Sequence, residues 1–188
     1  PEAMVVCGTG ENCNLRILGT SQGKDGLFLT AEWKGVRHEL TVPLFGEHQL
    51  PNVAIAFAAA CTYGIDADAV ALALKTTPQI THRFEVKPGP NGAVLIDDAY
   101  NSNPDGFASA LAALDILVET GGRRILATPG MVELGSDHDE EHERLGVIAA
   151  RHVDVLLAIA PARIEKFVSA FELHKAAEEE TIRFDAFE

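Results

Sequence analysis

Cysteine and basic residues are scarce in this chain of 188 residues. The three cysteines, Cys7, Cys13 and Cys61, are too few and too irregularly spaced for a disulfide framework or a CxxC metal site, so we expect reduced thiols in a cytoplasmic protein. Lys and Arg total 15 against 28 Asp and Glu, and the formal net charge is -13. Nucleic acid and anionic membranes both demand basic patches, so this charge argues against either as a main partner.

Long apolar runs are also lacking, although hydrophobic residues make up 47% of the chain, an ordinary value for a globular protein. No run is long enough to cross a bilayer, and residues 1–6 lack the charged and apolar regions of a secretory signal, so we expect a soluble protein. Pro1 is not an initiator methionine, which suggests either a processed product or an excised piece of a longer protein. This length can bury the core of one large domain or two small ones.

Short apolar runs separated by turn residues follow the N-terminus, at residues 15–18, 27–33 and 36–42. The last two runs flank Lys34-Gly35, so we expect an antiparallel hairpin there. The stretch 19–26 between the first two runs is expected to be a turn.

Two helices are expected next. Residues 52–64 form an alanine-rich segment that ends in Gly64, and Asp66 is a good cap for a second helix over residues 67 to about 75. Residues 76–81 have no periodicity, so we place a domain boundary there. The predicted domains are residues 1–80 and 81–188.

The rest of the chain alternates between strand and helix patterns. Apolar runs predict strands at 93–97, 124–128, 153–159 and 181–184. Helices are expected between them, at 104–119, 140–152 and 161–173. Strands separated by helices of this length imply βαβ units, so the expected fold class is α/β, with a Rossmann-like, mostly parallel sheet.

The first of these strands ends in a polar turn, Asp97-Asp98-Ala99-Tyr100-Asn101-Ser102-Asn103-Pro104. Asn103 is a good N-cap and Pro104 suits the first helical position. Ligands of open α/β sheets bind at the carboxyl ends of strands, where a carboxylate can accept hydrogen bonds from a ribose. We therefore expect Asp97, Asp98 and Asn101 to cluster at the carboxyl edge of the parallel sheet and the two aspartates to bind a nucleotide; the alternative is a pair of solvated turn residues.

Residues 96–105, Ile-Asp-Asp-Ala-Tyr-Asn-Ser-Asn-Pro-Asp, resemble the I-D-D-x-Y-N-A-N-P-D signature of the Mur ligases, ATP-dependent amide-bond-forming enzymes of peptidoglycan synthesis. The chain is most similar to the branch of the family that adds D-alanyl-D-alanine to UDP-N-acetylmuramoyl-tripeptide. Three further segments match the family in order and rough spacing: Gly-Glu-His-Gln-Leu-Pro-Asn at 46–52, Thr-His-Arg-Phe-Glu at 81–85 and Gly-Met-Val-Glu-Leu-Gly at 130–135. Such ligases phosphorylate the terminal carboxylate of the UDP-muramoyl-peptide with ATP and Mg²⁺, and the amine then attacks the acyl phosphate.

The resemblance implies roles for particular residues. Asp98 matches an acidic residue that contacts the ATP ribose, and Asn52 matches an asparagine that contacts adenine, while Gln49 replaces the family's first asparagine of that motif. Arg83 matches an arginine that reaches the nucleotide phosphates when the domains close, which makes it the expected catalytic residue. A surface arginine in a linker is the alternative for Arg83.

Tyr100, Asn101 and Asn103 are the expected binders of the amine substrate, although Asn101 and Asn103 could equally satisfy the backbone of the turn and Tyr100 could be a packing ring. Pro129-Gly130 departs from the family's Gly-Asp, so an aspartate role there has no counterpart. His138 and His142 have the spacing of two zinc ligands, but Asp139 stands where the HExxH motif needs Glu, so we expect no metal site.

A phosphate-binding G-x-x-x-x-G-K-[ST] loop, which the family carries in its central domain, is absent from the chain. We therefore expect residues 1–80 to be the end of the central ATPase domain and residues 81–188 to be most of the C-terminal domain, a fragment inactive by itself. The expected partners are small molecules.

Two alternative functions remain. One is a folylpolyglutamate synthetase, whose usual D-G-A-H-N-P does not fit the turn at 97–104. The other is a non-catalytic nucleotide-binding or partner-binding Rossmann domain.

Overall fold

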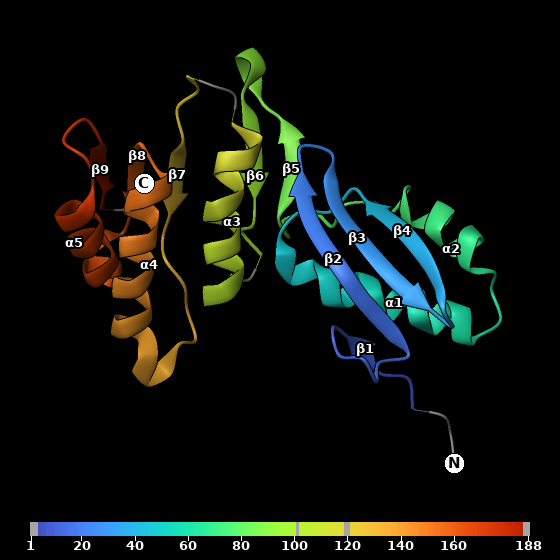
Figure 1. Cartoon of the computed structure of the whole chain (residues 1–188). Coiled ribbons are helices and arrows are strands. Elements are labelled where there is room, and N and C mark those ends of the chain that lie inside the picture. The colour runs from blue at the N-terminus through green and yellow to red at the C-terminus, as the bar shows by residue number, and fades with distance from the viewer. Residues whose placement is uncertain (1–3, 101, 119–120, 186–188) are drawn as a thin grey trace. The chain divides into compact units, whose positions relative to one another are not determined.

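The computed structural model describes residues 4–100, 102–118 and 121–185. The chain forms two compact units, Pro1–Asp97 and Asp98–Glu188. Figure 1 shows the elements of each unit in chain order. No helix in the described part of the chain is long and apolar enough to span a bilayer.

The first unit is built on a four-stranded sheet in the order β1-β2-β3-β4, in which β1 is parallel to β2 and the other neighbours are antiparallel. The predicted hairpin is confirmed, because Trp33 pairs with Val36 and the two turn residues have left-handed φ values of 51° at Lys34 and 79° at Gly35. The strands are β1 (Cys7–Gly8), β2 (Leu15–Gly23), β3 (Gly26–Trp33) and β4 (Val36–Val42).

The strand β2 is longer than the sequence indicates. Its polar second half, expected as a turn, continues the ladder to a pair between Gly23 and Gly26, after a register shift between Ile17 and Gly19. Exposure of this half explains its polarity, since residues 18–21 face solvent. The apolar pattern therefore identified only the buried part of the strand.

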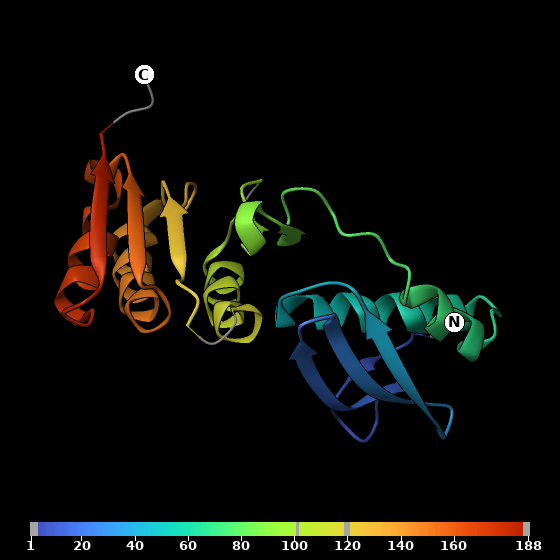
Figure 2. The same cartoon turned by 90° about the horizontal axis from the view of Figure 1, so that it is seen from above.

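Two helices follow the sheet, α1 (Leu50–Thr62) and α2 (Ala67–Leu74), and α1 packs along one face of the sheet, as both views show (Figures 1 and 2). The side chain of Asp66 accepts hydrogen bonds from the backbone N–H groups of Asp68 and Ala69, both at 3.1 Å, which confirms the predicted cap. Fully buried side chains of the core include those of Leu15, Leu27, Leu29, Leu40 and Phe57.

A small hairpin ends the first unit. The strands β5 (Glu85–Pro88) and β6 (Val94–Asp97) pair antiparallel, with Glu85 opposite Asp97. The expectation that residues 93–97 belong to the parallel sheet is therefore wrong, and β5 is a strand that the sequence did not predict. The turn between the strands contains Asn91-Gly92, with φ values of 56° and 78°, a dipeptide suited to hairpin turns.

The second unit contains the predicted parallel sheet, in the order β7-β8-β9. Both views show α4 and α5 on one face of it (Figures 1 and 2). The elements are α3 (Pro104–Leu117), β7 (Ile125–Thr128), α4 (His138–His152), β8 (Val155–Ile159), α5 (Glu165–His174) and β9 (Glu180–Phe184). The parallel α/β class is therefore confirmed for this unit.

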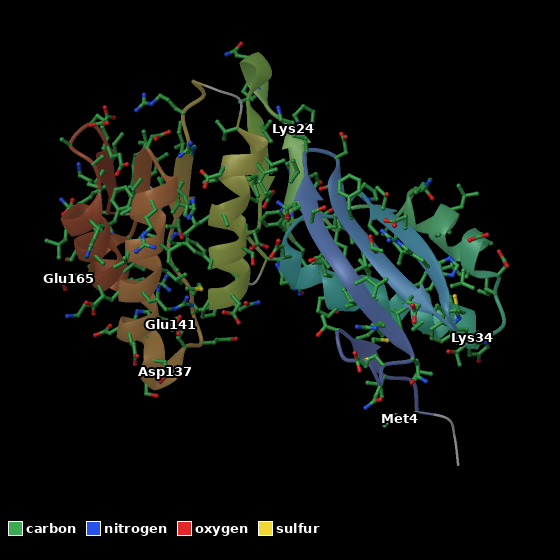
Figure 3. All side chains as sticks on the ribbon, in the orientation of Figure 1. Met4, Lys24, Lys34, Asp137, Glu141 and Glu165 are labelled. Atoms are coloured by element: carbon green, nitrogen blue, oxygen red, sulfur yellow. The ribbon has the colours of Figure 1, made fainter. Side chains whose placement is uncertain are left out.

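Acidic side chains mark the starts of its helices. Figure 3 labels Asp137 and Glu141 at the beginning of α4 and Glu165 at the beginning of α5. Carboxylates there interact favourably with the positive end of the helix dipole. A helix-to-helix contact fixes α4 on α5, since a Cβ on Gly146 would overlap the Phe167 carbonyl oxygen and lie 2.9 Å from the Ala170 Cβ.

Candidate functional site

The segment that carries Arg83 is a turn with unusual backbone angles. His82 and Phe84, on either side of the exposed Arg83, have left-handed φ values of 60° and 50°. Side chains other than glycine rarely adopt such angles, and they persist only where the surrounding structure holds them. Strained positions of this kind concentrate at functional sites, so the turn is the strongest candidate in the first unit.

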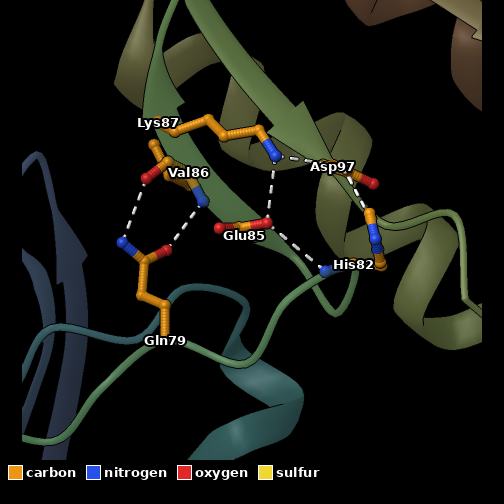
Figure 4. A network of polar contacts seen from close by, with 6 residues as sticks. All are labelled: Gln79, His82, Glu85, Val86, Lys87 and Asp97. Atoms are coloured by element: carbon orange, nitrogen blue, oxygen red, sulfur yellow. Dashed lines mark hydrogen bonds and ion pairs between the residues drawn. The ribbon is translucent and has the colours of Figure 1, made fainter.

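Four charged or titratable side chains gather beside this turn (Figure 4). The Lys87 ammonium lies 3.1 Å from Glu85 Oε2 and 3.2 Å from Asp97 Oδ2, and His82 Nδ1 donates to the same Asp97 oxygen at 2.9 Å. The hydrogen bond from Lys87 holds the pKa of Glu85 below its usual value, while the bonds to Glu85 and then Asp97 raise the pKa of Lys87. The Lys87 ammonium is therefore shared between two carboxylates, and the His82 ring is bonded to one of them.

The same network tests whether the chain can hold a divalent metal. His82, Glu85 and Asp97 place ligand atoms within 4.8 Å of one another, as a metal site requires. The Lys87 ammonium is already bonded to both carboxylates, so a cation bound there would have to displace it. These residues therefore do not fit Mg²⁺, and a triphosphate and its metal would need the phosphate-binding loop that the sequence lacks.

Asn52, the expected adenine contact, belongs to a chain of side-chain hydrogen bonds at the start of α1. Its Nδ2 donates to Gln49 Oε1 at 2.9 Å, and Gln49 Nε2 lies 3.2 Å from His48 Nε2. Asn52 is exposed, and the His48 ring meets Phe84 edge-on with centroids 6.2 Å apart. The amide of Asn52 is therefore oriented by Gln49, the residue that replaces an asparagine of the family motif.

The polar turn before α3 has the predicted cap. Asn103 Oδ1 accepts a hydrogen bond from the Gly106 N–H at 2.9 Å, and Pro104 begins the helix. Asp98 is half-buried and Tyr100 is 68% exposed. Asn101 lies outside the described residues. The structure thus assigns a helix-capping contact to Asn103 and presents the Tyr100 ring to solvent.

The loop after β7 is held by a buried histidine. His142, 1% exposed, accepts a hydrogen bond from the Met131 N–H at Nε2 (3.1 Å) and donates from Nδ1 to the His138 carbonyl (2.7 Å). Burial lowers the pKa of His142, in keeping with a neutral ring. Gly130, with φ 76°, has no room for a side chain, because a Cβ would overlap Ile164 and lie 2.6 Å from His142 Nε2. His138 Nε2 donates to the Arg163 carbonyl at 2.9 Å, so both histidines at zinc-ligand spacing are bonded to backbone groups.

The two units and their motifs define an α/β class of protein with a parallel sheet and a polar strand-to-helix turn. The Mur ligase, glutamate ligase domain matches residues 82–188, which is more than half of the chain. The chain therefore belongs to the Mur ligase family.

Curated relatives show which ligases of the family the chain is similar to in sequence. The UDP-N-acetylmuramoyl-tripeptide--D-alanyl-D-alanine ligase of Mycobacterium tuberculosis (strain ATCC 25618 / H37Rv) is 38% identical over 117 residues, which cover 60% of this chain and 23% of the relative. The ligase of the same name from Bacillus subtilis (strain 168) is 28% identical over 141 residues, covering 75% and 30%. The chain thus spans about a quarter of the length of these relatives.

Solved structures share the fold. MurF ligase from Thermotoga maritima in complex with ADP superposes with a TM-score of 0.71 at 19% identity, covering 97% of this chain and 44% of that one. UDP-N-acetylmuramate-alanine ligase MurC from the same organism gives 0.70 at 18% identity, covering 96% and 39%. Because the two scores are nearly equal, the fold alone does not distinguish the ligases of this family.

The expected site residues divide between the two units. Asn52, Arg83 and Asp97 lie in the first, whereas Asp98, Tyr100 and Asn103 lie in the second. Sequence reasoning missed Lys87 and Glu85 and gave His82 no role, although the structure bonds all three into the network with Asp97. The signal available for them was the Asn91-Gly92 turn, which brings strands 85–88 and 94–97 together.

Proposed function

We propose that this chain is part of an ATP-dependent ligase that adds D-alanyl-D-alanine to UDP-N-acetylmuramoyl-tripeptide through an acyl-phosphate intermediate. The observation that carries the proposal is the 38% identity over 117 residues to ligases named for this reaction. The four family motifs, which keep their order along the chain, support it.

In this proposal the chain supplies nucleotide contacts and the closing arginine. Asp98 accepts hydrogen bonds from the ribose, and the exposed amide of Asn52, oriented by Gln49, contacts the adenine. The Arg83 guanidinium stabilises the charge that develops on the transferred phosphoryl group. Tyr100, Asn101 and Asn103 are the proposed binders of the amine substrate. When bound, ATP would supply the phosphoryl group and Mg²⁺ would offset the negative charge of its phosphates. Both would be held by the part of the ligase that carries the phosphate-binding loop.

The two charged residues should affect different kinetic constants. Ribose contacts exist in both the ground and the transition state, so Asp98→Ala should raise the KM for ATP. Arg83 acts on developing charge, so Arg83→Ala should lower kcat more than it raises KM. One charge-assisted hydrogen bond contributes roughly 1.5–3 kcal/mol, so each effect should be about tenfold to a hundredfold. Arg83→Lys should recover only part of the rate, because an ammonium lacks the two-pronged geometry of guanidinium.

The experiment is steady-state ADP release by the longer ligase that contains this chain, with the UDP-muramoyl-tripeptide and D-alanyl-D-alanine present. The wild type, Asp98→Ala, Arg83→Ala and Arg83→Lys are compared, and the 188-residue chain alone serves as the inactive control. A wild-type ligase that releases ADP with no dependence on D-alanyl-D-alanine would contradict the proposed reaction. Unchanged ATP kinetics in both alanine variants would show that Asp98 and Arg83 are solvated loop charges.

A further inference from the structure

The backbone around Arg83 is restrained on its N-terminal side. The His82 ring donates to Asp97 Oδ2 at 2.9 Å, and the His82 N–H points to Glu85 Oε2 at 3.4 Å. The Arg83 N–H itself donates to the Ile80 carbonyl at 3.1 Å. A left-handed His82 is thereby bonded through both its side chain and its backbone, which offsets the cost of its conformation.

The C-terminal side of Arg83 is anchored by an aromatic ring. Phe84 is 2% exposed, and its ring lies 6.4 Å from that of Phe45 and 6.2 Å from that of His48 (centroid distances). Such tilted and edge-on arrangements are favourable for aromatic pairs. Phe84 cannot leave its position beside Phe45 and His48 without exposing its ring to water, so packing fixes its left-handed backbone.

A third restraint ties the preceding segment to β5. The Gln79 amide bonds to both backbone groups of Val86, as the backbone of a paired strand would. Its Nε2 donates to the Val86 carbonyl at 3.0 Å, and its Oε1 accepts from the Val86 N–H at 2.7 Å (Figure 4). This pair of bonds closes residues 79–86 into a loop with Arg83 inside it. Both partners are half-buried, so the bonds have limited competition from water.

Lys87 is the residue on which the charged part of the network depends. It is the cation between Glu85 and Asp97, which pair directly across β5 and β6. Like charges directly opposite one another destabilise a strand pair, so removing the ammonium would set these carboxylates against each other. The side chain of Asp97 is 17% exposed, and the oxygen that accepts from Lys87 also accepts from His82.

We propose that Lys87, together with Asp97, Glu85, His82 and Gln79, is a positioning network that holds the Arg83 turn in its reactive conformation. Asp97 acts through this network, so the ribose contact belongs to Asp98 alone. The inference rests on the proposed function for the role of Arg83. The network itself can be tested without catalysis.

The first test uses amide hydrogen exchange in the 188-residue chain. Lys87→Gln and Gln79→Ala should each speed exchange of the Arg83 amide about tenfold or more, while the Val70 amide of α2 stays at its wild-type rate. Lys75→Gln, at an exposed lysine of the same unit, is the matched control and should change neither amide. Wild-type exchange at Arg83 in both network variants would overturn the proposal, whatever the protein catalyses.

The second test uses the longer ligase and a double-mutant cycle. Lys87→Gln and Asp97→Asn should each lower kcat about tenfold and leave the KM for ATP within about threefold, because a displaced arginine loses transition-state contacts first. In an Arg83→Ala background the same changes should have little further effect, since the network acts through Arg83. Multiplicative losses, or a rise in KM alone for Asp97→Asn, would overturn the positioning role. A wild-type ligase without activity would refute the proposed function and leave the exchange result to decide the network.

Discussion

The two units stabilise the segments that carry their family motifs by different kinds of contact. In the first, the Arg83 turn is fixed at the surface by charged groups, with the His82 side chain 53% exposed and Lys87 shared between two carboxylates. In the second, the loop after β7 is fixed by His142, which is 1% exposed, neutral and bonded to backbone groups. A surface turn can tolerate water and salt, whereas a buried loop requires every polar atom to have a partner.

This difference indicates different roles for the Arg83 turn and the loop after β7. Charged groups near an arginine can orient it while leaving it accessible, which suits a residue that meets a ligand. A buried neutral imidazole stabilises the loop and leaves no charge to attract one. We therefore expect substitutions in the loop after β7 to change stability most, and substitutions around Arg83 to change catalysis most.

The largest loss of stability should come from Gly130→Ala. The new Cβ would overlap Ile164 and crowd the His142 ring, and a left-handed φ of 76° adds backbone strain. Overpacking and strain together should cost about 3 kcal/mol, measured by urea unfolding. Gly135→Ala is the matched control in the same loop, because Gly135 is also left-handed but has nothing within 4 Å of a Cβ; it should cost about 1 kcal/mol. Equal losses in the two variants would show that the close approach to His142 and Ile164 is unimportant.

His142 should make the stability depend on pH. Its Nε2 accepts the Met131 N–H, so a proton added there would place two donors against each other. Because burial lowers the pKa of His142 in the folded state, the unfolded chain binds the proton more readily. The resulting stability is complete above the unfolded pKa of about 6.5 and is lost as pH falls from there through the folded value.

His142→Gln tests this dependence, because glutamine does not titrate and can still accept a hydrogen bond. The variant should lose about 1–2 kcal/mol at pH 7 and show a flatter fall in unfolding free energy between pH 7 and pH 5 than the wild type. His174→Gln, at an exposed histidine of the same unit, is the matched control for the substitution itself. An unchanged slope in His142→Gln would assign the acid sensitivity to other groups.

The sequence predicted local features well and long-range ones poorly. The Asp66 cap, the Asn103-Pro104 start of α3 and the Lys34-Gly35 turn were all predictable, because each depends on residues within four positions of one another. The family was predictable from short motifs in order. These signals require no knowledge of what packs against them.

The Arg83 turn could not be predicted in this way. The bond between His82 and Asp97 joins residues 15 apart, and β5 has only four residues, including Pro88, with too few apolar positions to show a period. The neutral state of His142 depends on its burial against the loop after β7, which its spacing to His138 does not reveal. The two histidines of α4 that have the spacing of zinc ligands in the sequence are hydrogen-bonding groups in the structure.

The smallest effect on stability should come from Lys87→Gln, and it sharpens the contrast between the units. Lys87 is 36% exposed and its partners reach water, so the midpoint of urea unfolding should move less than in His142→Gln. The shift should shrink further in 1 M NaCl, because salt screens both the ion pairs and the repulsion between Glu85 and Asp97. Lys75→Gln gives the baseline for loss of an exposed lysine. A shift as large as that of His142→Gln, and insensitive to salt, would mean that the Lys87 network mainly stabilises the first unit. That result would contradict the proposed contrast, in which the loop after β7 serves stability and the Arg83 turn serves placement of the arginine.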